Sequence, residues 1–311
     1  MAFFLEERAS GERGLLPSGF PDRKAPAAEK IFEARYRLTR FFVEKGYALH
    51  SPPLLEFADG AHVASPSLRD VFRVTDPGSR ETLILRGDVT AQIARMAAAE
   101  ISSGKAALPL RISYSGKAVR TEADEYGGLR ERTQVGLEHI GGPFDEALRE
   151  TAALLLENLL RERRGRVVFV AGLPDMVSEL ENMVAHTHDE RRAFRLALAY
   201  KDRDYAKNTL CDAIDAEWLL GMKEGTPSRL PDALAIHTEC ADNLCNELKT
   251  HFSRVDCRVD PADVHRYPYH KRLVFSVFCA DTGRELARGG HYRLEGVDAA
   301  GATLFVEDVC L

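Results

Sequence analysis

No stretch of this 311-residue sequence approaches the ~20 consecutive apolar residues that a membrane-spanning helix needs, so we expect no membrane segment. The first residues, MAFFLEERASGERG, place acids directly after a short apolar run and lack a small-residue cleavage pattern. This composition argues against an export signal. The six cysteines all lie in the last third of the chain and form no repeating framework. We therefore expect reduced thiols and a cytoplasmic protein.

An excess of basic residues is also absent. Lys and Arg number 42 against 48 Asp and Glu, which gives a formal charge of −6. Non-specific nucleic-acid binders are normally basic, so we expect no nucleic-acid partner. The sequence contains no phosphate loop, no dinucleotide-binding glycine motif and no nucleophile elbow. With 45% hydrophobic and 29% charged residues, the composition is that of an ordinary globular protein.

Metal-ligand patterns are weak. One candidate is the run from His186 to Glu190, and the other combines His237, Cys240 and Cys245. Neither has the paired spacing that is typical of a zinc site, and both lie in polar sequence with helical character. We expect neither a metal nor a cofactor.

The first half of the chain predicts helices that alternate with strands. Residues 28–45 have one apolar face and precede Gly46, which predicts a helix that ends there. The segment YALHSPPLLEF carries two prolines, which favours a sheet edge or an interface. The segments PLRISYSGKAVRTE and RERTQVGLEHIGG predict a large antiparallel hairpin. The following segment, DEALRETAALLLENLLRERRG, predicts an amphipathic helix closed by Gly165.

The second half changes character twice. Residues 173–250 are mostly helical in pattern and more polar, whereas KRLVFSVFCAD and RELARGGHYR return to strand character. This order predicts an α+β fold with a mainly antiparallel sheet flanked by helices. We assign residues 1–172 and 251–311 to the core and residues 173–250 to a helical insertion.

The second strand of the predicted hairpin carries a possible ligand-binding face. Residues two apart share one face of a strand, so Gln134, Gly136 and Glu138 point the same way. A glycine between an amide and a carboxylate lets a cationic or zwitterionic small molecule approach the backbone. The alternative is a polar stripe that faces solvent, and the pattern alone favours this alternative.

Two further groups have both a structural and a functional interpretation. Arg120 ends the first hairpin strand and suits a carboxylate or phosphate, but a surface ion pair across the hairpin is commoner. Glu122 lies on the same face and suits a role in orienting that guanidinium. Asp88 and Thr90 stand at the start of a predicted helix, where they are either N-capping residues or partners of a ligand ammonium group.

These segments, in this order, resemble the catalytic core of class II histidyl-tRNA synthetase. They resemble still more closely its paralogue, the regulatory subunit of short-form ATP phosphoribosyltransferase. The resemblance covers nearly the whole chain. Its segments are YALHSPPLLEF with Pro53 as the first class II motif, LRGDVTAQIAR, the second motif YSGKAVRTEADEYGGLRERTQVGLEHIGG, YPYHKRLVF and ELARGGHY.

The resemblance implies a class II synthetase-like sheet without a C-terminal anticodon-binding domain, and a pocket for histidine. It places Asp88, Thr90, Gln134 and Glu138 at the amino end of that ligand. Arg120 would face a carboxylate or phosphate. Tyr269 and His270 would line the imidazole side.

The departures from the synthetase pattern concern catalysis. Arg132 stands where an aromatic residue normally stacks on adenine, and the third-motif segment ATLFVEDVCL contains no arginine. A histidine-specific arginine aligns with His265, with Arg266 beside it. Loss of these cations should cripple adenylate formation, because preorganised charge is a large part of such catalysis. We therefore expect no catalytic residues and no catalysis from this chain alone.

The resemblance also implies partners. It predicts a non-catalytic regulatory subunit that activates the short catalytic subunit of ATP phosphoribosyltransferase and mediates feedback inhibition by L-histidine in the first step of histidine biosynthesis. It further predicts a homodimer, formed through the first motif, within a larger hetero-oligomer. The alternatives are a truncated or divergent histidyl-tRNA synthetase core and another histidine-binding paralogue of the synthetase.

One segment diverges from the regulatory subunits. Lys271 and Arg272 occupy positions that are usually small or uncharged in that family. Histidine binding at a different place, such as a subunit interface, therefore stays open.

Overall fold

A computed structural model describes residues 16–58, 71–123, 128–210, 216–221, 230–263 and 270–311. Its main feature is an eight-stranded sheet in the order β1-β5-β6-β11-β10-β9-β7-β8. The strands are β1 (Ala48–His50), β5 (Leu110–Val119), β6 (Glu131–Ile140), β7 (Val167–Gly172), β8 (Val255–Val259), β9 (His270–Cys279), β10 (Glu285–Leu294) and β11 (Val297–Phe305). Only the outermost described pairs, β1–β5 and β7–β8, are parallel. The expected α+β fold with a mainly antiparallel sheet is confirmed.

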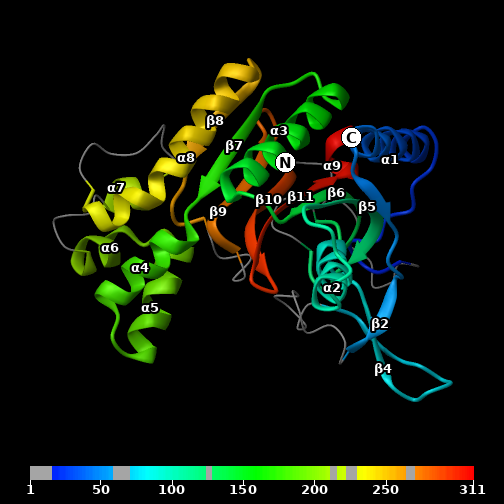
Figure 1. The fold of residues 1–311 in the computed structure, drawn as a ribbon, viewed down its shortest axis with the longest axis horizontal. Coiled ribbons are helices and arrows are strands. Elements are labelled where there is room, and N and C mark those ends of the chain that lie inside the picture. The colour runs from blue at the N-terminus through cyan, green and yellow to red at the C-terminus, as the bar shows by residue number, and fades with distance from the viewer. Residues whose placement is uncertain (1–15, 59–70, 124–127, 211–215, 222–229, 264–269) are drawn as a thin grey trace, which may run out of the picture.

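Helices cover both faces of this sheet (Figure 1). They are α1 (Ala27–Glu44), α2 (Val89–Ser102), α3 (Phe144–Glu162), α4 (Pro174–Val184), α5 (His188–Ala199), α6 (Arg203–Thr209), α7 (Ala216–Leu219), α8 (Asp232–His251) and α9 (Val306–Cys310). Val135 and Leu137 of β6 join a hydrophobic core with α1 and α3. Ile140 of the same strand joins a second core with α2. The two cores lie on opposite faces because successive strand residues alternate.

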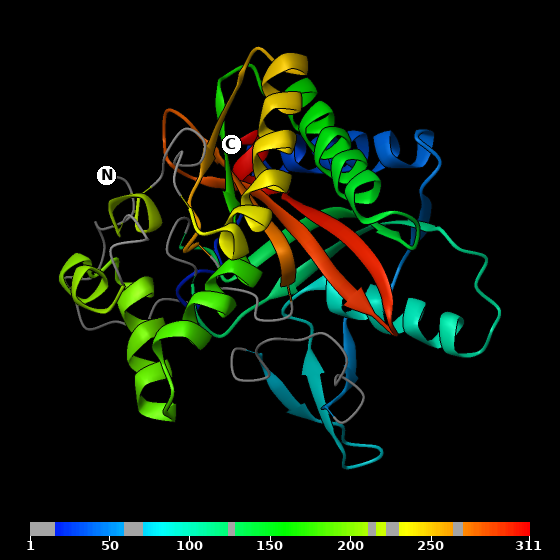
Figure 2. The same ribbon diagram turned by 60° about the vertical axis from the view of Figure 1, so that its left-hand side comes forward.

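A small second sheet lies apart from the main one (Figure 2). It pairs β2 (Leu55–Phe57), β4 (Thr82–Leu85) and β3 (Arg73–Thr75) in the order β2-β4-β3. The proline-containing segment thus supplies β1 at the edge of the main sheet and β2 at the edge of the small one. The edge placement predicted from Pro52 and Pro53 is confirmed, since neither proline can donate a ladder hydrogen bond.

The predicted helices and the hairpin form near their expected positions. Helix α1 buries Ala34, Leu38 and Phe41, which lie on its predicted apolar face. The hairpin β5–β6 pairs from Leu110 opposite Ile140 to Val119 opposite Glu131. One end was predicted wrongly: α3 stops at Glu162, because the next residue, Arg163, is already in an extended conformation.

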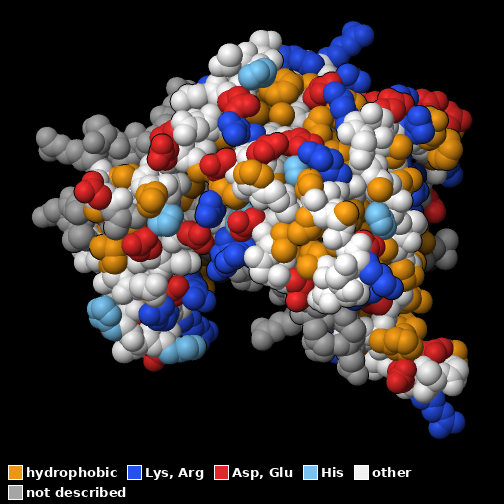
Figure 3. Space-filling model, viewed as in Figure 1, with side chains coloured by type: hydrophobic (Ala, Val, Ile, Leu, Met, Phe, Trp, Pro, Cys, Tyr) orange, Lys and Arg blue, Asp and Glu red, His pale blue; other side chains and the backbone are white. Residues whose placement is uncertain are grey.

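Helices α4 to α8 occupy residues 174–251, the part for which we expect a helical insertion. Figure 3 shows a notch in the surface between α4–α7 and the body of the molecule. Buried residues of this segment, such as Leu180, Phe194 and Leu244, nevertheless belong to the same hydrophobic cluster as the sheet. The assignment of residues 173–250 to an insertion separate from the core therefore remains a prediction. No described helix is both long and apolar enough to cross a lipid bilayer.

Candidate functional site

The candidate site lies on the α2 face of the sheet and is built by strand register. Tyr114 of β5 stands opposite Gly136 of β6, which stands opposite Thr303 of β11. In the neighbouring row, Glu138 of β6 stands opposite Gly301 of β11. Each large polar side chain thus has a glycine beside it. The register therefore leaves room for these side chains to fold over the adjacent strand.

Gly136 has a different role from the one that the ligand-binding interpretation gave it. A Cβ there would lie 2.2 Å from the phenol oxygen of Tyr114. The glycine therefore accommodates a side chain of the protein itself, where the sequence suggested the close approach of a ligand. The Tyr114 hydroxyl lies 2.7 Å from the hydroxyls of both Thr90 and Thr303. These three hydroxyl groups form a row beside Glu138, in which Tyr114 and Thr303 are buried and Thr90 is half-buried.

Glu138 is fully buried at the centre of the site. Its Oε2 accepts a 2.8 Å hydrogen bond from the Tyr292 hydroxyl, and its Oε1 has no hydrogen-bond partner among the described residues. Burial raises the pKa of Glu138 to about 8, against the lowering effect of the Tyr292 hydrogen bond. The Thr90 and Tyr114 hydroxyls also lower this pKa. Because the carboxyl group is protonated at neutral pH, it must lose its proton before it accepts a cationic donor at Oε1.

The predicted solvent-facing stripe is therefore wrong. Gln134 is 3% exposed and Glu138 is 0% exposed. Strand β6 lies between β5 and β11, and helices pack on both of its faces. Gln134 also has a structural role, because its Oε1 accepts a 2.9 Å hydrogen bond from the Val89 backbone at the start of α2.

The start of α2 lies beside the site, and Asp88 caps the helix there. Asp88 accepts a 2.8 Å hydrogen bond from the Thr90 backbone, which confirms its predicted N-cap role. Arg120 lies 3.8 Å from the Asp88 carboxylate and donates to the Gly87 carbonyl at 3.2 Å. The predicted ion pair of Arg120 thus exists, but it joins β5 to α2 and does not cross the hairpin.

Four of the predicted ligand residues line one cavity of about 20 Å³: Asp88, Thr90, Glu138 and His270. Burial, together with the charges of His291 and Arg288, lowers the pKa of His270 to about 3, so the imidazole is neutral at physiological pH. Arg120 and Gln134 line a second cavity of about 20 Å³, and Arg288 lines both. Tyr269, His265 and Arg266 lie outside the described residues.

The second cavity is rich in arginine. The guanidinium groups of Arg132 and Arg288 lie 4.7 and 4.8 Å from the ring centre of Phe305. Arg132 also pairs with the Asp308 carboxylate at 3.2 Å, and both side chains are buried. The resemblance expects an aromatic residue here that stacks on adenine. This position is instead filled by Arg132 with its partners Phe305 and Asp308.

Sequence reasoning missed several residues of the site, namely Tyr114, Arg288, Tyr292, Gly301 and Thr303. The segment ELARGGHY gave a signal for Tyr292, because two glycines precede it by two and three residues. The others had no local signal, since strand pairing alone brings them to Glu138. Among the described residues, no group of three or more His, Cys, Asp and Glu side chains suits a metal ion.

Comparison with known proteins gives a consistent result. The histidyl-tRNA synthetase family profile matches residues 19–309. The ATP phosphoribosyltransferase regulatory subunit of Rhodospirillum rubrum is 31% identical over 312 residues, which cover 96% of this chain and 81% of that protein. The regulatory subunit of Paramagnetospirillum magneticum is 31% identical over 316 residues, with 96% and 82% covered.

Solved structures share the fold. An ATP phosphoribosyltransferase regulatory subunit/histidyl-tRNA synthetase from Bacillus halodurans aligns with a TM-score of 0.78 and 22% identity, covering 100% of this chain and 83% of that one. A chain of the ATP phosphoribosyl transferase (HisG:HisZ) complex from Thermotoga maritima aligns with a TM-score of 0.66 and 17% identity, covering 93% and 100%.

Proposed function

Since the chain belongs to the histidyl-tRNA synthetase family, and within it to the ATP phosphoribosyltransferase regulatory subunits, we propose that it is a non-catalytic regulator of histidine biosynthesis. It activates the short catalytic subunit of ATP phosphoribosyltransferase and carries the response to L-histidine, and it acts in the cytoplasm. One observation carries this proposal. The polar cavity around Glu138 is present, whereas the place where a synthetase would bind adenine is filled by Arg132, Phe305 and Asp308.

The chemistry of the cavity supports histidine as the effector. Glu138 offers a buried acceptor for the α-ammonium group. The neutral imidazole of His270 suits an uncharged heteroaromatic side chain, and Arg120 in the adjoining cavity suits a carboxylate. The cavity of about 20 Å³ is smaller than an amino acid, so binding requires its lining to move apart. Such a movement lets histidine favour one state of the complex over another.

The same cavities argue against adenylate formation. In the synthetase pattern, an aromatic residue at the position of Arg132 stacks on adenine. Here the Arg132 guanidinium is buried and paired with Asp308, and Arg288 is paired with Glu285. Helix α9 holds Asp308 in place, because neighbouring Glu307 accepts two 2.8 Å hydrogen bonds from Thr133. Nucleotide binding at this position would have to break these contacts.

Reconstitution tests the proposal. This chain is mixed with the short catalytic subunit from the same genome, and phosphoribosyl-ATP formation is followed with histidine, with alanine and without any amino acid. We expect activation that histidine suppresses by about 5- to 150-fold, the usual range of a coupling free energy, and that alanine leaves unchanged. No association and no activation would overturn the proposal. ATP-dependent histidine adenylation would then be the reaction to assay.

We also propose a homodimer. Three large apolar side chains are exposed in and around β1 and β2. They are Leu49 (54% exposed), Leu54 (46%) and Phe57 (50%). Phe32 and Tyr36 of α1 are 74% and 64% exposed. Several large exposed apolar side chains within two neighbouring segments are typical of an interface.

The double variant Leu49→Glu/Phe57→Glu is therefore expected to halve the molar mass measured by light scattering. Buried charges at an apolar contact cost several kcal/mol, roughly enough to dissociate a dimer. Leu196→Glu is the matched control, because Leu196 is 47% exposed on α5 in the helical segment. An unchanged mass for the double variant would place the interface elsewhere.

A further inference from the structure

A third cavity, of about 470 Å³, lies between α3 and α8, and neither Glu138 nor Arg120 lines it. Phe144 and Leu148 of α3 and Leu244 of α8 form its apolar part, and all three are buried. Ile236, which is 69% exposed, lies at its rim. The volume lies within the range of small-molecule sites. The rest of the lining is mostly polar or charged, with Asp145, Arg149, Asp175, His237, Glu239, Asn243 and Arg272.

The cavity holds one cation that no described acid neutralises. The exposed Arg272 guanidinium lies 4.4 Å from the ring centre of Phe144, and its charge also acts on Cys240 and His291. Arg272 also has a φ of +50°, in the left-handed region that non-glycine residues seldom adopt. Such backbone strain is tolerated where it serves to place a side chain.

Apart from Asp145, which accepts from the Cys240 thiol at 3.8 Å, two acids line the same cavity without a cationic partner among the described residues. Asp175 lies in the first turn of α4, and Glu239 lies on α8. Neither lies within ion-pair distance of Arg272, although all three line one cavity. An arginine and separate carboxylates around an apolar floor match the charge pattern of a free amino acid. Its carboxylate fits the guanidinium and its ammonium fits the acids.

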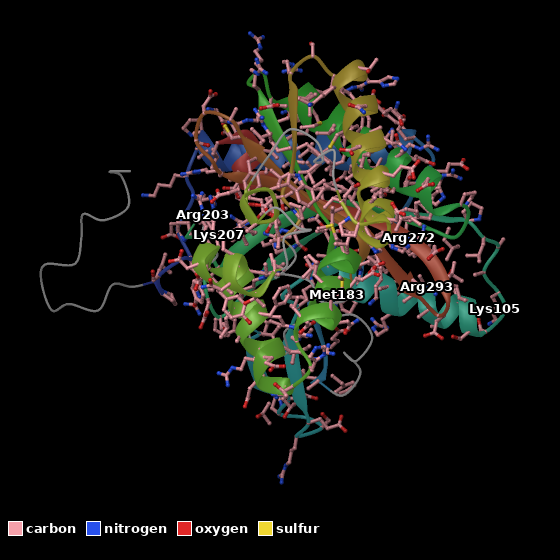
Figure 4. The ribbon with its side chains drawn as sticks, turned by 90° about the vertical axis from the view of Figure 1, so that its left-hand side faces the viewer. Lys105, Met183, Arg203, Lys207, Arg272 and Arg293 are labelled. Atoms are coloured by element: carbon pink, nitrogen blue, oxygen red, sulfur yellow. The ribbon has the colours of Figure 1, made fainter. Side chains whose placement is uncertain are left out.

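Arg272 connects this cavity to the candidate site. It lies two residues after His270 on β9, where the register with β10 shifts between Gly290 and His291. His270 lines the cavity beside Glu138, whereas Arg272 lines the α3–α8 cavity. Figure 4 shows Arg272 beside the end of α8, with Arg293 further along the β10–β11 ribbon. His270 and Arg272 therefore belong to one strand segment that lines both cavities.

We propose that the α3–α8 cavity binds a free α-amino acid with an apolar or aromatic side chain, held by Arg272 at its carboxylate and by Asp175 and Glu239 at its ammonium group. This site is separate from the cavity around Glu138 and does not depend on the proposed regulatory function.

The test is calorimetric titration of the full chain with each of the common amino acids. We expect saturable binding of at least one of them, weakened at least about tenfold in Arg272→Gln and in Glu239→Gln, because each loses a charge-assisted contact. Lys271→Gln is the matched control, since Lys271 is the exposed neighbour on β9 and does not line the cavity. Thermal melts of every variant establish that the fold is intact.

A Glu138→Gln variant separates the two sites. Binding that survives in this variant and is lost in Arg272→Gln supports the α3–α8 site. Binding that Glu138→Gln abolishes and Arg272→Gln leaves unchanged overturns it, and leaves the regulatory proposal intact. Absence of binding by any amino acid at millimolar concentration also overturns it.

Discussion

Replacing Glu138 by glutamine is expected to stabilise the protein at alkaline pH and to make it insensitive to histidine. The carboxyl group is fully buried, and burial raises its pKa to about 8. Glutamine keeps the shape of the side chain and removes its charge. The substitution thus shows separately how the buried charge affects the free energy of unfolding and how it affects histidine binding.

The sign of the pH effect follows from the raised pKa. The folded-state value of about 8 lies above the ordinary glutamate value of about 4.3, so ionisation disfavours the folded state. The stability that the protonated form provides is complete below about pH 4.3 and is lost as the pH rises through 8. The difference between variant and wild type should be small at pH 4.5 and reach about 5 kcal/mol at pH 8.5.

Urea unfolding at these two pH values measures this difference. Glu81→Gln is the control, because Glu81 is exposed and its side chain has no contact within the described residues. Its unfolding free energy should follow that of the wild type at both values. An equal free energy of unfolding for Glu138→Gln and wild type at pH 8.5 would contradict the assignment of a costly buried charge.

The same variant should lose the effector. Without the carboxylate, the α-ammonium group of histidine has no anionic partner at Oε1, and we expect affinity to fall by about 30-fold or more. In the wild type, Glu138 must lose its proton before it accepts the ammonium. Histidine affinity should therefore rise about 50-fold between pH 6 and 8, and most steeply between pH 6 and 7. Titration calorimetry at pH 6, 7 and 8 measures this slope, and an affinity independent of pH would contradict it.

Substituting Gly301 by alanine is the second change with a large expected effect. A Cβ at this position would lie 1.8 Å from Oε2 of Glu138 and 2.4 Å from its Cδ. Gly301 stands directly opposite Glu138 in the β6–β11 ladder, so neither backbone can move away without breaking the sheet. The carboxyl group must leave its place, together with its hydrogen bond to Tyr292.

We expect Gly301→Ala to cost about 3 kcal/mol of unfolding free energy, the upper range for overpacking, and to abolish histidine binding. Gly78→Ala is the control, because a Cβ there meets only the Asp76 carboxylate oxygens at 3.7 Å. Denaturant unfolding and calorimetry provide the two readouts.

A double-mutant cycle shows whether the carboxyl group is the cause. In a Glu138→Ala background the atoms nearest to the new methyl group are gone, so Gly301→Ala should cost much less than in the wild type. A coupling free energy of about 2 kcal/mol between the two positions is expected. Additive effects would show that Gly301 is needed for another reason.

Local sequence was sufficient for much of the fold. The apolar spacing of Ala34, Leu38 and Phe41 fixed α1, and Asp88 identified the start of α2. The alternation within 110–119 and 131–140 identified the hairpin. Each of these features depends on residues within a few positions of one another. Helix periodicity, capping and strand alternation are local effects, so the sequence carries them directly.

The candidate site could be predicted only in part. The resemblance to a family pointed to Asp88, Thr90, Glu138 and His270, and the structure places all four around one cavity. Pattern reasoning by itself favoured a solvent-facing stripe at Gln134 and Glu138, which is wrong. Whether a strand face is buried depends on what packs against it, and a strand pattern does not contain that information.

The sequence by itself therefore determined α1, the start of α2, the hairpin, the absence of a catalytic arginine in the segment ATLFVEDVCL, and the class of the protein. Only the tertiary structure decided that Tyr114 fills the space above Gly136, that Gly301 makes room for Glu138, and that Arg132 closes on Phe305. These contacts join residues that lie 22 to 173 positions apart in the chain. They follow from the register of β5, β6 and β11, which forms only when the whole sheet assembles.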